Sequence, residues 1–326
     1  MTGQVQTGWH AALWRALRLA HRADFAWVLP WMARLPLSLG YRLAGWRGRF
    51  NAASGRDWRS VALGFRHIQR QSLAGYRLLP GASTDQECLA WRDERFVVEA
   101  RDEYEACLIA RRRVAELNCS FVPADAARPG LLRQRGLLLL TPHFDSFFVG
   151  VAFLARSGAK INLMTSAVTR DPRVDAAVQQ HFNHKYRGLE HCLNGGQLLD
   201  LESGLRPFYR MLERHETLVV LGDAPVLGDG VAMTVDFLGA PRTLAGGALR
   251  MAQRTGSDMG GYVCRYLGPG RYELALCPTG PADDADTVAR VYRFFSQQIL
   301  ANPGRWWAAD LLPNMPVADD RRGVLP

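Results

Sequence analysis

Short apolar runs alternate with longer polar segments over the last two-thirds of the chain. The runs that predict buried strands cover residues 137–141, 160–165, 217–221, 233–237, 259–265 and 272–276. Between and after them, helical composition or spacing is found over residues 145–154, 175–186, 205–214, 245–254 and 286–300. This alternation of strands and helices is typical of an α/β protein.

The first third of the chain has a different pattern. Residues 57–118 are rich in charged and helix-forming residues, and residues 85–118 make the longest such segment. Residues 123–130 contain proline and glycine and predict a loop or linker. We therefore predict a helical N-terminal region over residues 1–125 and an α/β domain over residues 126–326.

If residues 9–28 form a helix, basic and apolar side chains fall on different faces. Tryptophan with arginine suits the headgroup layer of a membrane, whereas a closed core has little use for many arginines. The alternative is a helix that packs on its own domain; we favour a membrane-interface segment. The basic face holds Arg15, Arg18 and Arg22, and the apolar face holds Trp9, Leu13, Leu17, Ala20 and Trp27.

Composition and charge set wider limits. The 326 residues are 48% hydrophobic, which is enough for a large core. Forty basic residues against 31 acidic ones leave a charge of +9, and most of the basic residues are arginine. This favours polyanionic partners such as phospholipid head groups, phosphorylated ligands or nucleic acid, or it reflects only the base composition of the genome. Since no nucleic-acid-binding motif organises the arginines, we expect no nucleic acid partner.

The cysteines and the apolar stretches indicate in which cellular compartment the protein resides. The six cysteines show no C-x-x-C pair and no regular spacing, which predicts reduced thiols in a cytosolic compartment. The longest uncharged N-terminal stretch, residues 25–33, is interrupted by Pro30 and is too short to span a bilayer. We expect neither a cleaved signal peptide nor a membrane-spanning helix.

The first candidate for chemistry is His143, which follows the apolar run 137–141 and precedes a helix-like segment. This position predicts the end of a strand, where an open α/β sheet borders its ligand crevice. A neutral imidazole there can take a proton from a bound hydroxyl near neutral pH. The alternative is a structural histidine.

A second candidate is Asp223, which follows the apolar run 217–221 just as His143 follows its own run. A carboxylate that bonds one imidazole nitrogen fixes the tautomer and stabilises the imidazolium. We predict this orienting role for Asp223, and a simple turn aspartate is the alternative.

Residues 237–252 form a third feature, rich in small residues. Small residues let a backbone approach a ligand, and a helix that begins near Ala245 would present free amides to a phosphate or oxyanion. The segment matches neither a Walker loop nor a dinucleotide fingerprint.

Taken in order, these motifs resemble the bacterial lipid A late acyltransferases, the lauroyl and myristoyl transferases of the lysophospholipid acyltransferase superfamily. The resemblance runs from about residue 135 to residue 307. It depends on Pro142-His143-Phe144, the later strand that ends in Asp223, Phe237-Leu238-Gly239 with Thr243 and Gly246, and Asn302-Pro303-Gly304-Arg305-Trp306-Trp307.

The resemblance implies a mixed central sheet flanked by helices, as in glycerolipid acyltransferases, and an O-acyltransferase with His143 as general base. The donor would be an acyl-carrier-protein or coenzyme A thioester, and the acceptor a hydroxyl of a lipid A precursor or similar glycolipid. No metal and no other cofactor are implied. The implied location is peripheral, at the cytoplasmic face of the bacterial inner membrane.

One departure from the family pattern concerns the acid. The family normally carries an acidic residue five positions after the histidine, where this chain has Phe148. Asp145 and Asp223 are the two candidates to replace it, and we favour Asp223. If Asp145 begins the helix, it caps backbone amides instead.

The remaining site predictions concern binding. We expect the acyl chain in an apolar groove near Phe147 and Phe148. The resemblance further suggests acceptor or donor contacts from Arg170, Arg173, Arg187, Thr243 and Gly246. We also considered a metal site at His181, His184 and His191. It is disfavoured because the chain has no H-E-x-x-H pattern there.

Two alternatives to lipid A acylation stay open. The first is an acyltransferase for another acceptor in a specialised pathway. The second is a catalytically silent homologue that binds lipid or carrier protein. A serine hydrolase is disfavoured because the chain has no G-x-S-x-G elbow.

Overall fold

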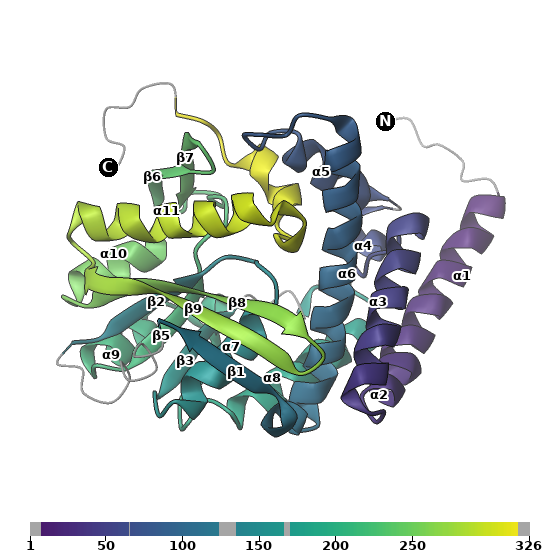
Figure 1. Ribbon diagram of the computed structural model, residues 1–326, viewed down its shortest axis with the longest axis horizontal. Helices are drawn as coiled ribbons and strands as arrows, with labels where there is room; N and C mark the ends of the chain where they lie inside the picture. Colours follow the sequence, from purple (N-terminus) through teal and green to yellow (C-terminus); the bar gives the residue numbers. More distant parts are fainter. Residues whose placement is uncertain (1–7, 65, 124–134, 166–169, 319–326) are drawn as a thin grey trace.

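The computed structural model describes residues 8–64, 66–123, 135–165 and 170–318. Its centre is a seven-stranded sheet with the strand order β1-β9-β8-β2-β5-β3-β4 (Figure 1). The strands are β1 Asn118–Val122, β2 Leu137–Thr141, β3 Ile161–Thr165, β4 Leu198–Asp200, β5 Thr217–Leu221, β8 Asp258–Gly268 and β9 Arg271–Pro281. All neighbouring pairs are parallel except β8 and β9, which form an antiparallel hairpin. The prediction of an α/β protein with a mixed sheet is therefore confirmed.

Strand β2 explains why the sheet is covered on both faces. Its leucines alternate between two apolar clusters, with Leu137 and Leu139 in one and Leu138 and Leu140 in the other. Because successive side chains of a strand point to opposite faces, a run of buried leucines requires helices on both sides. The first face is covered by α7 Phe147–Arg156 and α8 Ala176–Glu190, and the second by α9 Arg206–Glu213, α10 Gly247–Arg254 and α11 Ala285–Ala301.

The N-terminal region is helical, as predicted. Its elements are α1 Gly8–Ala23, a π-helical turn η1 Asp24–Val28, α2 Leu29–Met32, α3 Leu37–Ser54, α4 Ser60–Leu63, α5 His67–Tyr76 and α6 Asp85–Ala110. Helix α6 begins with a capping box between Thr84 and Glu87. Figure 1 shows α6 standing between the sheet and the hairpin of α1 to α3. Strand β1 belongs to the sheet but lies before residue 126. The boundary between the two predicted regions, after residue 125, therefore stays a prediction.

The first helices leave many side chains outside the core. His21, Asp24 and Phe25 are buried, whereas Arg15, Arg18 and Trp27 are exposed. The side chains of Trp9 and Leu13 lie outside the described residues. No described helix is long and apolar enough to cross a bilayer.

The small-residue segment differs from its prediction. Residues 240–245, predicted as a small-residue loop before the helix, instead form the second strand of a hairpin, in which β6 Ala232–Phe237 pairs with β7 Ala240–Ala245. The turn is at Leu238 and Gly239, whose φ angles of 53° and 80° match a two-residue hairpin turn. Helix α10 starts only at Gly247.

Two other strands were missed because their patterns are weak. Strands β1 and β4 are the edges of the sheet, and their residues are half-buried or exposed rather than a continuous apolar run. Apart from Pro123, the predicted linker over residues 123–130 lies outside the described residues. The remaining short elements are the 3-10 turns η2 Arg113–Glu116, η5 Leu201–Ser203, η6 Pro303–Arg305 and η7 Ala309–Asn314.

Candidate active site

His143 lies directly after β2, in a tight turn before α7. The Phe144 amide donates to the Pro142 carbonyl at 2.7 Å, and this bond closes the turn around His143. The imidazole is about four-fifths buried, with 21% of its side chain exposed. Phe147 and Trp307 meet it edge-on, at centroid distances of 5.8 and 5.5 Å. The ring is therefore held in one orientation by aromatic neighbours.

Asp223 comes from the neighbouring strand β5. Thr141 and Leu221 are paired in the parallel register, and the Gly222 amide donates to the Thr141 carbonyl at 2.9 Å. This register brings the two strand ends together, and Asp223 Oδ1 lies 2.8 Å from His143 Nδ1. The sequence prediction that Asp223 reaches the histidine agrees with this geometry.

The second carboxylate oxygen of Asp223 is also occupied. Oδ2 accepts hydrogen bonds from the His143 amide at 2.8 Å and from Trp306 Nε1 at 2.7 Å. Asp223 is fully buried, so these donors replace the water that an ionised carboxylate requires. An ionised carboxylate only accepts hydrogen bonds, and it therefore calls for a proton on Nδ1. Nε2 is then left unprotonated, as a general base needs.

Residues 305–307 fix the positions of His143 and Asp223 through backbone hydrogen bonds to the turn that contains His143. The Trp307 amide donates to the His143 carbonyl at 3.0 Å, and the Asp145 amide donates to the Arg305 carbonyl at 2.9 Å. These two bonds fix the segment beside the histidine turn and place the Trp306 indole against Asp223. The site is thus assembled from β2, β5 and the chain after α11.

Asp145 occupies a different environment. Its carboxylate pairs with Arg101 and with Arg305, the latter at 3.0 Å, and accepts the Tyr266 amide at 3.0 Å. The prediction that Asp145 caps α7 is wrong, because the carboxylate binds an amide of β8 instead. Among the described residues, Asp223 is the acid that contacts His143.

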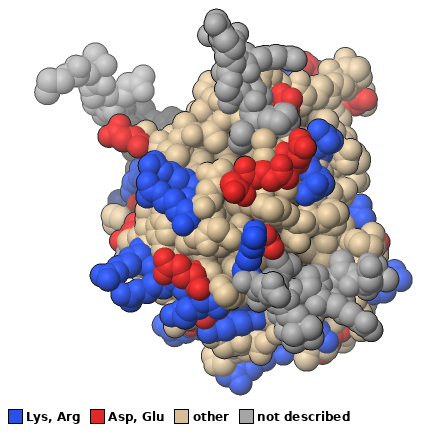
Figure 2. Space-filling model, turned by 90° about the vertical axis from the view of Figure 1, so that its left-hand side faces the viewer, with Lys and Arg blue, Asp and Glu red and all other residues tan. Residues whose placement is uncertain are grey.

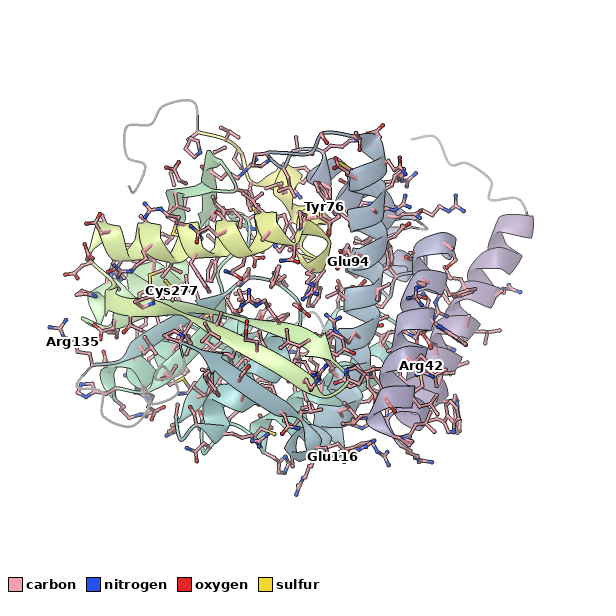
Figure 3. The ribbon with its side chains drawn as sticks, in the orientation of Figure 1. Arg42, Tyr76, Glu94, Glu116, Arg135 and Cys277 are labelled. Atoms are coloured by element: carbon pink, nitrogen blue, oxygen red, sulfur yellow. The ribbon has the colours of Figure 1, made fainter. Side chains whose placement is uncertain are left out.

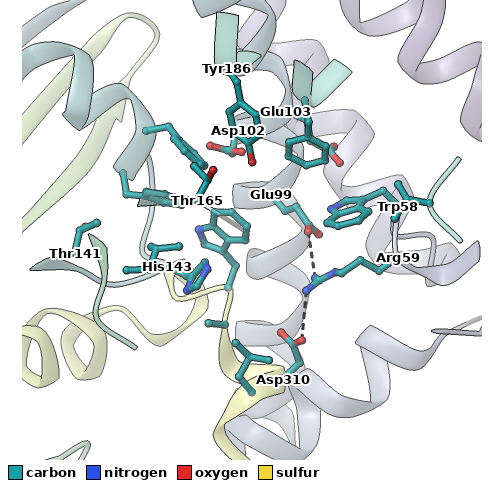
Figure 4. Close-up of a pocket in the computed structure, with 18 of the residues that line it drawn as sticks. Trp58, Arg59, Glu99, Asp102, Glu103, Thr141, His143, Thr165, Tyr186 and Asp310 are labelled. Carbon is teal, nitrogen blue, oxygen red and sulfur yellow. Dashed lines mark hydrogen bonds and ion pairs between the residues drawn. The ribbon is translucent and has the colours of Figure 1, made fainter. Parts of the chain in front are cut away.

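A cavity of about 340 Å³ opens beside His143. Its apolar wall includes Phe147, Phe148, Leu163 and Leu221. The opposite wall is charged, and Figure 4 shows Arg59 between Glu99 and Asp310 on the side away from His143. Arg59 lies 3.3 Å from Glu99 and 3.4 Å from Asp310. The cavity thus joins a base, an apolar surface and a polar wall.

The charged wall is made largely by buried groups. Burial raises the pKa of Glu99 to about 8, although Arg95 beside it acts in the opposite direction. Asp102 pairs with Lys185 at 2.8 Å. The Lys185 ammonium lies 3.4 Å from the centroid of the Phe148 ring, a cation–π contact. Phe148, where the resemblance implied an acid, is therefore part of a packed contact with Lys185.

The other predicted binding residues divide into two groups. Phe147, Phe148 and Arg173 line the cavity, and Arg173 is paired with Asp171 at 2.6 Å. The others do not line it. Arg170 is largely exposed and pairs with Asp200, Arg187 lines a separate cavity, Thr243 lies in β7, and Gly246 precedes α10.

Several residues of the site were not predicted as functional. Trp306 and Trp307 were noted as part of a motif, but no role followed from it. Arg59, Glu99, Asp102, Glu103 and Asp310 line the cavity without having been singled out. The only signal was the unusual charge of the segment that forms α6, which the sequence alone does not distinguish from a solvated helix.

The histidines considered as metal ligands do not form such a site within the described residues. No group of three or more His, Cys, Asp or Glu residues able to hold a metal is found in the described part of the chain. His181 is buried, and its Nδ1 lies 3.7 Å from Cys107 Sγ.

A His–Asp pair at the edge of parallel strands, next to an apolar cavity, has the geometry to take a proton from a bound group. Residues 120–308, more than half of the chain, match the family described as bacterial lipid A biosynthesis acyltransferase. The chain belongs to this family, and the protein is an acyltransferase.

The other comparisons add little. No curated protein matches this chain. Among solved structures, one match is the 1-acyl-sn-glycerophosphate (LPA) acyltransferase PlsC from Thermotoga maritima. It is 11% identical, covers 83% of this chain and 99% of that chain, and has a TM-score of 0.36.

Proposed function

We propose that the protein is an O-acyltransferase in which His143 removes the proton from an acceptor hydroxyl. The observation that carries this proposal is the bond between His143 Nδ1 and the buried Asp223, which directs an unprotonated Nε2 to the cavity. An alcohol is a poor nucleophile until a base takes its proton during attack. As His143 takes the proton, the oxygen attacks the thioester carbonyl; the carbon–sulfur bond then breaks, and the imidazolium returns the proton to the departing thiolate.

The donor in this proposal is an acyl thioester of acyl carrier protein or coenzyme A. The acceptor is a lipid A precursor or a similar glycolipid, in keeping with the family. The apolar wall at Phe147, Phe148 and Leu163 would take the acyl chain, because burial of each methylene favours binding by about 0.8 kcal/mol. The charged wall would then face the polar part of the acceptor.

We also propose that the protein works on the cytoplasmic face of the bacterial inner membrane, as a peripheral protein. Large aromatic side chains are exposed on the N-terminal helices, with Trp27 at 76%, Trp31 at 53% and Trp46 at 63% exposure. Arginine accompanies them, and Figure 3 places Arg42 on this side of the molecule, opposite Arg135. Exposed tryptophan and arginine together are the composition of a membrane-interface surface.

The test measures product formation with purified protein. Acyl-carrier-protein and acyl-coenzyme A donors would each be offered with a lipid A precursor, and free thiol carrier and acylated lipid followed by mass spectrometry. We expect His143→Ala to lose at least about 100-fold of the turnover, since general base catalysis contributes about 10² to 10⁴. The control is His67→Ala on α5, which should keep full activity.

Two results would reject the proposal. The first is a His143→Ala variant with unchanged turnover. The second is wild-type protein that binds an acyl donor without releasing the thiol, which would instead identify a silent binding protein.

A further inference from the structure

A second cavity, of about 450 Å³, lies between η1, the C-terminal end of α6, and α8. It shares no lining residue with the cavity at His143. Figure 1 shows the lower end of α6 meeting α2 and α8 at this place. The residues that line it include Arg111, Arg112, Arg187, His184 and His191, and none of the lining residues is a carboxylate.

The charge of this cavity is uncompensated. Arg111, Arg112 and Arg187 are exposed and form no ion pair with any described residue, and all three line this one cavity. Buried His181 also lines the cavity, and its Nε2 has no hydrogen-bond partner among the described residues. Several unpaired guanidinium groups around a hollow are the usual means of binding phosphate.

The position of the cavity indicates where such a phosphate comes from. Ala26 and Pro30 form part of its wall, and they alternate along the helix with the exposed Trp27 and Trp31. The cavity therefore opens beside the surface that we assign to the membrane. Its other wall is apolar, with Phe25, Ala106 and Ala110, and suits the hydrocarbon next to a lipid phosphate better than a free ion.

We propose that this cavity binds the phosphate of an anionic phospholipid headgroup and so anchors the protein on the membrane at a second point. This inference rests on the membrane association proposed above. The ligand would act as an anchor and not as a reactant, because its cavity shares no lining residue with the cavity at His143, although α6 and α8 contribute to both.

The experiment compares vesicle binding of two charge-matched variants. One is Arg111→Gln/Arg187→Gln, in the cavity. The control is Arg250→Gln/Arg254→Gln on α10, whose two arginines are also exposed and lie at the far side of the molecule. On that side, basic and acidic side chains are intermingled (Figure 2). Vesicles contain phosphatidylcholine alone, phosphatidylcholine with phosphatidylglycerol, or phosphatidylcholine with a carboxylate lipid at the same surface charge.

We expect the cavity variant to lose about tenfold to thirtyfold in binding to phosphatidylglycerol vesicles, from the loss of two arginines near an anionic surface. The control variant should lose less than about threefold. Wild-type protein should prefer phosphatidylglycerol over the carboxylate lipid. Equal losses in both variants, or no preference between the two anionic lipids, would overturn the phosphate site.

Further measurements distinguish a lipid phosphate from other ligands that this cavity could bind. Titration calorimetry with inorganic phosphate should show no binding at millimolar concentration; tight binding would make free phosphate the ligand and overturn the lipid assignment. Turnover with acyl carrier protein should be unchanged in the cavity variant; a selective rise in KM would assign the cavity to the carrier. Wild-type protein that binds no vesicle at all would reject the membrane proposal itself.

Stability must also be measured, because Arg111 and Arg187 lie at the C-terminal ends of α6 and α8, where cations offset the helix dipole. A fall in Tm without a change in vesicle binding would show that this structural role is the whole role. If the double variant does not fold, the preference of wild-type protein between the two anionic lipids still decides the question.

Discussion

Replacement of Asp223 by asparagine tests the geometry of the site most directly, because it changes one atom. Asp223 Oδ2 receives two donors, the His143 amide at 2.8 Å and Trp306 Nε1 at 2.7 Å. An asparagine in the same place must turn its carbonyl oxygen to these two donors. Its NH₂ group then faces His143 Nδ1, which must accept a hydrogen bond and therefore loses its proton to Nε2.

The variant should thus hold the wrong tautomer while keeping its fold. In Ser-His-Asp enzymes the same substitution lowers kcat by about 10⁴ for this reason. A 10⁴-fold loss corresponds to about 5 kcal/mol of transition-state stabilisation. Binding of the donor should change little, because Asp223 is fully buried behind His143. We expect a fall in kcat of about 10³ to 10⁴ at nearly constant KM.

The assay is turnover with a thioester donor, combined with ¹⁵N NMR of the imidazole in histidine-labelled protein. His143 is identified among the eight histidines by its absence in a His143 variant. Wild-type protein should show the proton on Nδ1, and Asp223→Asn should show it on Nε2. Trp306→Phe is the matched control, because it removes one donor from Oδ2 but leaves the carboxylate and the tautomer. If Asp223→Asn keeps more than a tenth of the wild-type kcat, or keeps its proton on Nδ1, the reasoning fails.

Two further predictions follow from the cavity and from a buried histidine. Phe148→Ala should shift the preferred donor towards longer chains, by about fourfold in kcat/KM for each methylene newly buried, and Leu163→Ala should act in the same direction; an unchanged chain-length profile would remove Phe148 from the acyl groove. Burial lowers the pKa of His181 to about 3. The neutral ring is favoured in the folded protein, so its contribution to stability is fully present above about pH 6.5 and is lost as the pH falls towards 3. Chemical unfolding at pH 7 and pH 5 should show a loss of about 2 kcal/mol from this residue, and His181→Phe should remove that part of the pH dependence.

Much of the sheet could be predicted because its strands are buried on both faces. The run 137–141 and the run 217–221 match β2 and β5 at both ends, since a central parallel strand is a continuous apolar segment. The edge strand β4 could not be found this way, because its three residues are only half-buried. Strand β6 was predicted, as residues 233–237, whereas β7 was taken for a loop before the helix because its residues match that pattern.

In the candidate site, only the residues that directly follow a buried strand could be predicted from the sequence. His143 and Asp223 each follow a strong apolar run, so each was placed correctly from local pattern. Trp306 could not be predicted, because its contact with Asp223 depends on a chain segment that returns from 83 residues away. Thr243 and Gly246 do not line the cavity beside His143, because a resemblance in sequence order does not fix which cavity a loop borders.

Helix α6 carries charge through the interior of the protein, and its partners are scattered along the chain. Buried Arg95 and Glu99 are balanced by Asp57 and Arg59 before the helix and by Asp310 near the other end of the sequence. Glu103 is balanced by Arg47 of α3. Asp310 and Lys185 come from the second half of the chain and pair with Arg59 and Asp102 of the first half, so a fragment of either half would leave buried charges without their partners, at a cost of several kcal/mol each. If the N-terminal helices were exchanged between two members of the family, we therefore expect the chimera to fold only when the charged residues of the helices and their ion-pair partners elsewhere in the chain are exchanged together.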